Sequence, residues 1–229
     1  MFAGPNGSGK SYLQSILPKK LIGVFVNADE IEKALKSAEG LDLAFYQLSW
    51  TESEILSRLS SHSFSEQFKS LQVSVCQGVL SIEGEVNSYH ASALASIIRD
   101  ALIEAKISFS FETVMSHASK IEFLEKARGL GYRTYLYFIS TNTPEINVSR
   151  VAHRVNVEQG HDVPEEKIVT RYHRSLGLLR SALKVVDRGY VFDNSSSAPI
   201  WVLESVAGNE LVLQGESVPP WVIECLELY

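Results

Sequence analysis

The sequence predicts an α/β protein whose sheet is mostly parallel and carries helices on both faces. Short apolar runs rich in β-branched and aromatic residues alternate with segments of helical spacing along most of the 229 residues. A glycine-rich loop stands directly before the first helical segment. Near the carboxyl end, Ile200–Ser205 and Glu210–Gln214 flank the turn 207–209, which predicts a β-hairpin (198–215) added to the edge of the sheet.

The composition is that of an ordinary globular protein, with 45% hydrophobic and 21% charged residues. A chain of this length fits one domain, so we expect a single domain over 1–229. The net charge of −6 argues against nucleic acid as a partner. No apolar run reaches the roughly 18 residues of a membrane span, and no leader-like segment opens the chain. We therefore expect a cytoplasmic protein that does not bind membranes, with Cys76 and Cys225 reduced.

Four apolar runs are predicted to form the main strands, because each is short and rich in residues that favour strands. They are Leu21–Asn27, Ile107–Phe111, Tyr132–Ser140 and Gly189–Asp193. Met1–Ala3 would form one more strand before the glycine-rich loop, but it is shorter than the usual ~5–6 residues. We expect either that this strand is stunted or that the native chain starts upstream.

Helices are predicted between these strands from the 3–4 spacing of their apolar residues. They cover Asp29–Ser37, Ser88–Lys106, Ser119–Leu130, about 144–158 and a segment from Pro164 to about Val186. The two last helices, over 144–186, are expected to form a lid. Residues 40–87 mix serine and glutamate with apolar residues at helical spacing, and we interpret them as a helical insertion.

Residues 4–11 read GPNGSGKS and fit the pattern G-x-x-x-x-G-K-[ST], in which glycines let backbone N–H groups converge on phosphate oxygens. Lys10 would reach the β- and γ-phosphates of ATP, and the Ser11 hydroxyl would bind Mg²⁺. The motif predicts a three-layer P-loop NTPase fold. Its candidate ATP-binding residues are Gly4, Pro5, Asn6, Gly7, Ser8, Gly9, Lys10, Ser11 and Tyr12.

Two carboxylates follow predicted strands and would therefore lie at the ligand-binding edge of the sheet. Asp29 could accept the proton of an attacking hydroxyl, or it could cap the helix that follows it. Glu112 could hold substrate hydroxyls, or Mg²⁺ through water, or it could be an exposed carboxylate at a strand end. Asn27 and Thr113 stand beside them, and we assign them with Glu112 to the acceptor substrate.

Arginines gather in the two lid-like helices, where they could approach a triphosphate or form a solvated charged face. Arg150 and Arg154 are spaced i, i+4 and share one helix face, while Arg171 and Arg174 share a face of the next helix. After the fourth strand, Asn194 could donate a hydrogen bond to the adenine base or belong to a plain turn.

Seven short motifs occur in one order along the chain. They are GPNGSGKS, VNADEI, FSFETV, Gly131-Tyr132, RVAHRV, GHDVPEEKIVTRYHRSL and VFDNS. This series resembles the zeta-toxin family of P-loop kinases over about Met1–Ser195, apart from 40–87. The resemblance implies an ATP-dependent kinase that phosphorylates the 3′-hydroxyl of the sugar in UDP-N-acetylglucosamine, with an antitoxin protein as a candidate partner.

The resemblance also implies roles for individual residues. Lys10 matches the P-loop lysine, Ser11 the magnesium-binding hydroxyl, Asp29 the catalytic base and Glu112 the carboxylate that contacts the acceptor sugar. The phosphate-clamping arginines fall among Arg150, Arg154 and Arg171. The sequence departs from the family pattern at Tyr12, at Val114 and Met115, and over 40–87. Two alternatives stay open: a kinase of another small hydroxyl compound, and a nucleotide-binding module of weak activity that acts through a protein partner.

Overall fold

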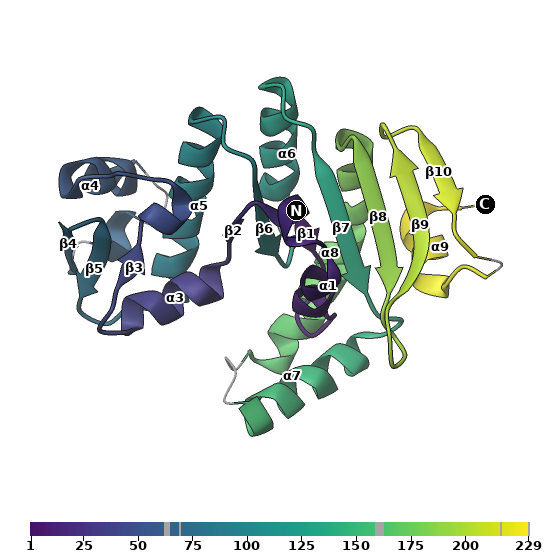
Figure 1. The fold of residues 1–229 in the computed structure, drawn as a ribbon. Coiled ribbons are helices and arrows are strands. Elements are labelled where there is room, and N and C mark those ends of the chain that lie inside the picture. Colours follow the sequence, from purple (N-terminus) through teal and green to yellow (C-terminus); the bar gives the residue numbers. More distant parts are fainter. Residues whose placement is uncertain (62–64, 69, 159–162, 216, 229) are drawn as a thin grey trace. The chain divides into compact units, whose positions relative to one another are not determined.

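A computed structural model describes residues 1–229 except 62–64, 69, 159–162, 216 and 229. The chain divides into two compact units (Figure 1). Unit 1 consists of Met1–Leu17 and Thr113–Tyr229, and unit 2 consists of Pro18–Glu112. Within the described ranges, no helix is long and apolar enough to cross a membrane.

Unit 1 contains a mixed sheet in the order β10-β9-β8-β7-β1. Strands β1, β7 and β8 run parallel, and β9 and β10 form the predicted antiparallel hairpin. The bounds are β1 (Phe2–Ala3), β7 (Tyr135–Ser140), β8 (Arg188–Asp193), β9 (Ile200–Val206) and β10 (Glu210–Leu213). Strand β7 starts later than the predicted Tyr132, because the Tyr132 N–H still donates to the Ala127 carbonyl in the turn that closes a helix.

The parallel strands of unit 1 are buried because their runs are almost continuously apolar. Leu136 and Phe138 of β7 are fully buried, and the Phe138 ring lies 6.1 Å from the ring of Trp221. Tyr137 stacks on Tyr190 of the neighbouring strand at 5.1 Å. The aromatic residues of the sequence thus pack across strands as well as along them.

Five helices are described in unit 1, and all but α9 were predicted. The bounds are α1 (Lys10–Ile16), α6 (Ser119–Gly129), α7 (Pro144–Glu158), α8 (Glu165–Val185) and α9 (Pro220–Leu226). Helices α1 and α8 both contact β7, and Figure 1 shows α1 in front of the strands and α8 behind them. Helix α9 packs on α8 and starts at Pro220, a residue suited to the first turn of a helix.

Unit 2 contains a parallel strand pair, with Val24 of one strand opposite Phe109 of the other. Its bounds are β2 (Val24–Val26), β6 (Phe109–Thr113, whose last residue belongs to unit 1), α2 (Lys19–Ile22), α3 (Ala28–Lys36) and α5 (Ser88–Glu104). The prediction of a strand from Leu21 is wrong at its start. The Leu21 N–H donates to the Pro18 carbonyl in a short helix, and Gly23 with φ +63° ends that helix before β2.

The interpretation of residues 40–87 as helical is wrong for much of that segment. It contains one α-helix, but also an antiparallel sheet in the order β3-β5-β4. Gln77 and Gly78, with φ +50° and +82°, form a tight two-residue turn that pairs the strands on either side. The bounds are β3 (Leu41–Asp42), a 3₁₀ turn (Ala44–Tyr46), α4 (Glu52–Ser60), a second 3₁₀ turn (Ser65–Phe68), β4 (Gln72–Cys76) and β5 (Val79–Glu83).

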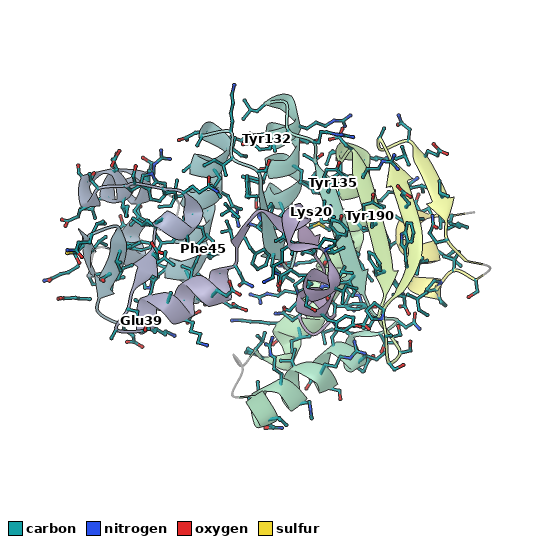
Figure 2. All side chains as sticks on the ribbon, viewed as in Figure 1. Lys20, Glu39, Phe45, Tyr132, Tyr135 and Tyr190 are labelled. Carbon is teal, nitrogen blue, oxygen red and sulfur yellow. The ribbon has the colours of Figure 1, made fainter. Side chains whose placement is uncertain are left out.

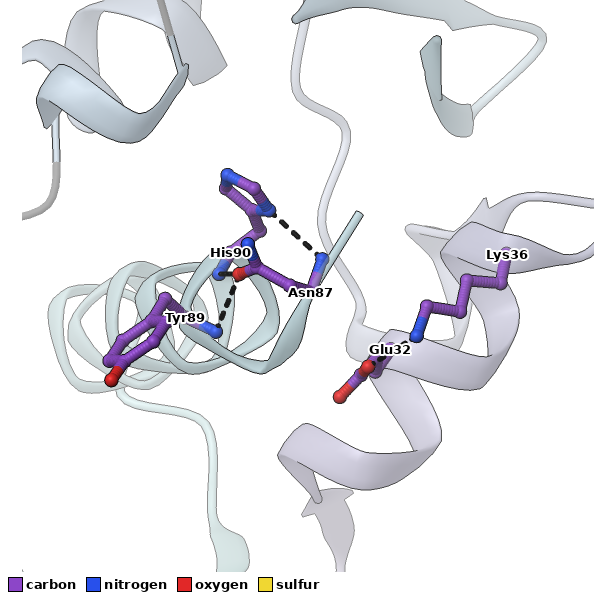
Figure 3. A network of polar contacts seen from close by, with 5 residues as sticks. All are labelled: Glu32, Lys36, Asn87, Tyr89 and His90. Atoms are coloured by element: carbon purple, nitrogen blue, oxygen red, sulfur yellow. Dashed lines mark hydrogen bonds and ion pairs between the residues drawn. The ribbon is translucent and has the colours of Figure 1, made fainter. Parts of the chain in front are cut away.

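A histidine helps to start helix α5 of unit 2 (Figure 3). The Asn87 side chain accepts from the backbone N–H groups of Tyr89 and His90, and the Asn87 N–H donates to His90 Nδ1 at 3.0 Å. This is a capping box with an imidazole in the place of the usual glutamate. Since Nδ1 accepts, Nε2 carries the proton and donates to the Gln67 carbonyl at 3.0 Å. In the same view, Lys36 and Glu32 form an ion pair within α3.

We expect Phe138→Ala to lower the free energy of unfolding by about 3–5 kcal/mol, because it removes a fully buried ring from the centre of β7. Urea denaturation measures this change. Tyr135→Ala on the same strand is the control (Figure 2), since Tyr135 is 37% exposed. We expect that control to cost about 0.5 kcal/mol. Equal losses in the two variants would contradict the placement of the core.

Candidate active site

At three positions the loop of residues 4–11 adopts a backbone conformation that favours glycine. Gly4, Gly7 and Gly9 have φ values of +145°, +73° and +99°, a region that other residues rarely adopt. Neighbouring segments also fill the space that their side chains would take. A Cβ at these three positions would lie 2.0 Å from Ile139 O, 2.6 Å from Asn147 O and 2.3 Å from Asn194 Nδ2, respectively. The loop therefore has the tight geometry that the motif predicts.

Lys10 and Ser11 lie side by side at the start of α1. Lys10 is buried, and its ammonium group turns back to donate to the Pro5 carbonyl at 3.0 Å. Ser11 is exposed at the next position, and Tyr12 is 52% exposed. A buried cation beside an exposed hydroxyl matches the residues that would hold a phosphate and its Mg²⁺.

Two hydrogen-bond donors near the loop are buried without a partner among the described residues. They are Ser8 Oγ and Arg150 Nη1. The acceptor Asn6 Oδ1 is also buried and has no hydrogen-bond partner among the described residues. Leaving a buried donor unpaired costs about 1–3 kcal/mol, which a ligand or an ordered water that accepts a hydrogen bond would recover. A hydroxyl and a guanidinium group are suited to phosphate oxygens. The residues present thus fit a bound anion.

Thr113 lies next to the first glycine of the loop. Its carbonyl accepts from the Gly4 N–H at 3.3 Å, and its Oγ1 accepts from the Met115 N–H at 3.1 Å. Its described contacts are therefore with the backbone of the loop and of the following turn. Binding of the acceptor by Thr113 stays a prediction.

Asn194, which follows β8, is brought to the loop. Its side chain is buried, and its amide donates to the Ser8 carbonyl at 2.8 Å. The sequence left a contact with adenine or a plain turn as its roles. The structure uses this amide to hold the loop, a role that the sequence did not suggest, and the contact with adenine stays a prediction. Asn147 on α7 makes a second such contact, which the sequence reasoning missed.

The turn that carries Asn194 rests on the carboxyl-terminal helix. Trp221 of α9 donates through Nε1 to Asp193 Oδ1 at 2.8 Å, and Ser195 Oγ donates to the same oxygen at 2.7 Å. The Asn142 N–H, just before α7, donates to Ser195 Oγ at 2.8 Å. No helix was predicted over 220–226, so this support was not predicted either.

The arginines lie on α7 and α8, which pack against each other. Arg150 Nη2 donates to the Ser196 carbonyl at 3.2 Å, which brings this guanidinium to the turn after β8. Arg154 follows one turn later on α7, and Arg171 is half-buried on α8. Residues 160–162, at the start of the quoted motif GHDVPEEKIVTRYHRSL, lie outside the described residues.

In unit 2, Asn27 and Asp29 follow β2, and Glu112 lies near the end of β6. Asn27 Oδ1 accepts from the Asp29 N–H at 2.8 Å, so Asn27 is the N-cap of α3. The alternative that Asp29 caps this helix is therefore wrong. The Asp29 carboxylate lies exposed in the first helical turn, where the positive end of the helix favours a negative charge.

Three carboxylates gather around the start of α3. Partial desolvation raises the pKa of Glu30, and the charges of Glu112 and Asp29 raise it further. Burial and the charge of Glu30 raise the pKa of Tyr46 to about 12. The parallel pairing of β2 and β6 thus places Asp29 and Glu112 within electrostatic reach of one side chain, as the sequence predicted for the ends of parallel strands.

We expect Glu30→Gln to raise the melting temperature near pH 8 and to have little effect near pH 4. Since the folded-state pKa of Glu30 is raised, folding favours the protonated form. The stability from this group is full below the unfolded pKa of about 4.3 and is lost as the pH rises through the folded pKa. Thermal melts across this range measure the difference. Glu39→Gln, an exposed carboxylate labelled in Figure 2, is the control, and a gain that persists at pH 4 would contradict the prediction.

The model of the zeta toxin family matches residues 81–204, more than half of the chain. The loop of residues 4–11 and Asp29 precede the matched range, so their assignment depends on the motif and the geometry above. A comparison with curated protein sequences finds no match.

Solved structures share the fold at low sequence identity. The ATP complex of AvrRxo1-ORF1:ORF2 matches with a TM-score of 0.55 and 14% identity over 93% of this chain, and the sulphate complex matches with a TM-score of 0.53. This chain spans 60% of those chains. The PezAT toxin–antitoxin system of Streptococcus pneumoniae matches with a TM-score of 0.50 and 13% identity, over 99% of this chain and 76% of that one. Because the family model matches more than half of its length, the chain belongs to the zeta toxin family.

Proposed function

We propose that this protein is an ATP-dependent kinase that transfers the γ-phosphoryl group to the 3′-hydroxyl of UDP-N-acetylglucosamine. In this proposal residues 1–229 act as one kinase domain, with the helices over 144–186 as its lid. Membership of the zeta toxin family supports a kinase, and the ATP complex of a structurally similar protein supports ATP as the donor.

One observation carries the nucleotide half of the proposal: a glycine loop with a buried lysine and unpaired buried donors. Lys10, Ser8 Oγ and Arg150 Nη1 would replace water around the phosphate oxygens. Ser11 would hold Mg²⁺, which neutralises charge on the β- and γ-phosphates when it is bound. Arg154 and Arg171 are candidates for stabilising the charge of the transferred group.

The acceptor half depends on the carboxylates of unit 2. Asp29 would accept the proton of the attacking sugar hydroxyl, which leaves the oxygen free to attack phosphorus. Its own carboxylate is not used as the helix cap, because Asn27 has that role. Glu112 and Asn27 would bind acceptor hydroxyls, and Thr113 is the third residue that we assign to the acceptor.

Specific observations also support two other functions. In the first, the phosphoryl acceptor is a different small hydroxyl compound, because residues 40–87 contain an unexpected sheet in the unit that carries Asp29 and Glu112. The second is action through a protein partner with weak catalysis. The structurally similar AvrRxo1-ORF1:ORF2 and PezAT assemblies support an antitoxin as that partner, and it would also suit an active kinase.

We expect transfer of label from γ-labelled ATP·Mg²⁺ to UDP-N-acetylglucosamine, with about 10²–10³-fold slower transfer in Lys10→Ala and about 10²–10⁴-fold in Asp29→Asn. Lys10→Ala should also weaken ATP binding, whereas Asp29→Asn should bind ATP normally. Lys20→Ala, an exposed lysine of α2 labelled in Figure 2, is the matched control.

The outcomes separate the three readings. ATP binding with transfer to another hydroxyl compound would replace the acceptor and keep the kinase. ATP binding with no transfer to any acceptor, and an unchanged cellular effect of Asp29→Asn, would favour the partner-binding module. Absence of ATP binding by the wild-type protein would overturn the proposal.

A further inference from the structure

Two buried asparagines, distant from each other in sequence, bind successive parts of the same loop. Asn147 in the first turn of α7 donates through Nδ2 to the Asn6 carbonyl at 2.5 Å. Asn194 after β8 donates through Nδ2 to the Ser8 carbonyl at 2.8 Å. Asn147 is fully buried, and Asn194 is 8% exposed. We call this pair the loop clamp.

The orientation of the Asn147 amide is fixed by its surroundings. The Asn6 carbonyl can only accept, so it must face the NH₂ group of Asn147. The Oδ1 of Asn147 then faces the Thr141 hydroxyl, which lies within hydrogen-bond reach of both this oxygen and the Thr143 carbonyl. Tyr172 of α8 donates to the Thr141 carbonyl at 2.6 Å, which ties the second lid helix to the same residue. Both polar ends of Asn147 are thus used inside the protein.

The loop clamp determines where two backbone N–H groups point. In a planar trans peptide, the carbonyl of one residue and the N–H of the next residue point in opposite directions. Because the Asn6 and Ser8 carbonyls point at the asparagines, the N–H groups of Gly7 and Gly9 must point away from them. A phosphate needs N–H groups turned toward it and carbonyl oxygens turned away, and the loop clamp produces this arrangement at alternate peptides.

The same two asparagines explain two of the glycines. A Cβ at Gly7 would lie 2.6 Å from the Asn147 carbonyl oxygen, and a Cβ at Gly9 would lie 2.3 Å from Asn194 Nδ2. Each asparagine therefore occupies the space beside the glycine whose N–H it orients. Asn147, Arg150 and Arg154 are spaced i, i+3 and i+7, so the helix face that holds the loop also carries the two arginines.

We infer that Asn147 and Asn194 are positioning residues that hold the N–H groups of Gly7 and Gly9 in the orientation for binding the phosphate chain of a nucleotide. This inference rests on the proposed nucleotide site. The bonds of the loop clamp to the loop, however, can be tested without any nucleotide. If the loop clamp only stabilised the fold, its loss would weaken the binding of ATP and of AMP to the same extent.

The experiment uses the full chain with Asn147→Ala, Asn194→Ala and Thr141→Val, and with Asn156→Ala as the matched control from an exposed position of α7. Thr141→Val keeps Asn147 but removes the hydroxyl that faces its Oδ1, so it serves if the alanine variants fold poorly. Hydrogen exchange of residues 4–11, measured without nucleotide, reports on the bonds of the loop clamp. Titrations with ATP, ADP and AMP, below the melting temperature of each variant, measure how strongly the loop binds the phosphate chain.

We expect loop amides to exchange about tenfold faster in both alanine variants, with a smaller rise in Thr141→Val and none in Asn156→Ala. ATP and ADP affinity should fall about tenfold while AMP affinity stays nearly constant. Unchanged loop exchange in both alanine variants would overturn the loop clamp. Faster exchange with an equal loss of ATP and AMP affinity would overturn the positioning role. A wild-type protein that binds no nucleotide, with faster loop exchange in the variants, would overturn the proposed function and leave a structural clamp.

Discussion

The site of unit 1 depends on one backbone constraint: the loop after β1 turns through conformations that only glycine adopts easily, and it does so against close neighbours. Ile139 at the end of β7, Asn147 on α7 and Asn194 after β8 surround it. The parallel pairing of β1 with β7 and of β7 with β8 brings these carboxyl ends to one edge. The sheet therefore determines the shape of the loop as much as the loop's own sequence does.

The two halves of the proposed chemistry use different electrostatic means. Around the loop, positive and neutral donors are buried, and some lack a partner among the described residues, which suits a ligand of high negative charge. Around α3, three carboxylates are placed together, and the pKa of Glu30 is raised first by desolvation and then by the charges of the other two. The first arrangement suits binding of a polyphosphate, and the second suits the acceptance of protons and hydroxyl groups.

The sequence allowed most of the regular elements and the loop to be predicted, because hydrophobic spacing and glycine chemistry act locally. Over 40–87 the prediction failed, since the turn at Gln77–Gly78 decides between helix and strand pairing and its signal is short. Nothing in the local sequence distinguishes Asn147 from Asn156 on the same helix. What separates them is burial against a loop about 140 residues away, which spacing does not reveal. The same reason explains why the contact of Asn194 with the loop was not predicted.

The loop clamp also bears on how far the phosphate loop can be moved between proteins. Residues 4–11 are a continuous segment, yet the groups that orient their peptides come from α7 and from the turn after β8. The turn after β8 is itself held by Trp221 of α9, a residue outside the range that the family model matches. A graft of the eight residues alone into another sheet would carry the glycines without the amides that make them necessary. The transferable unit is the loop together with two distant asparagines and their supports.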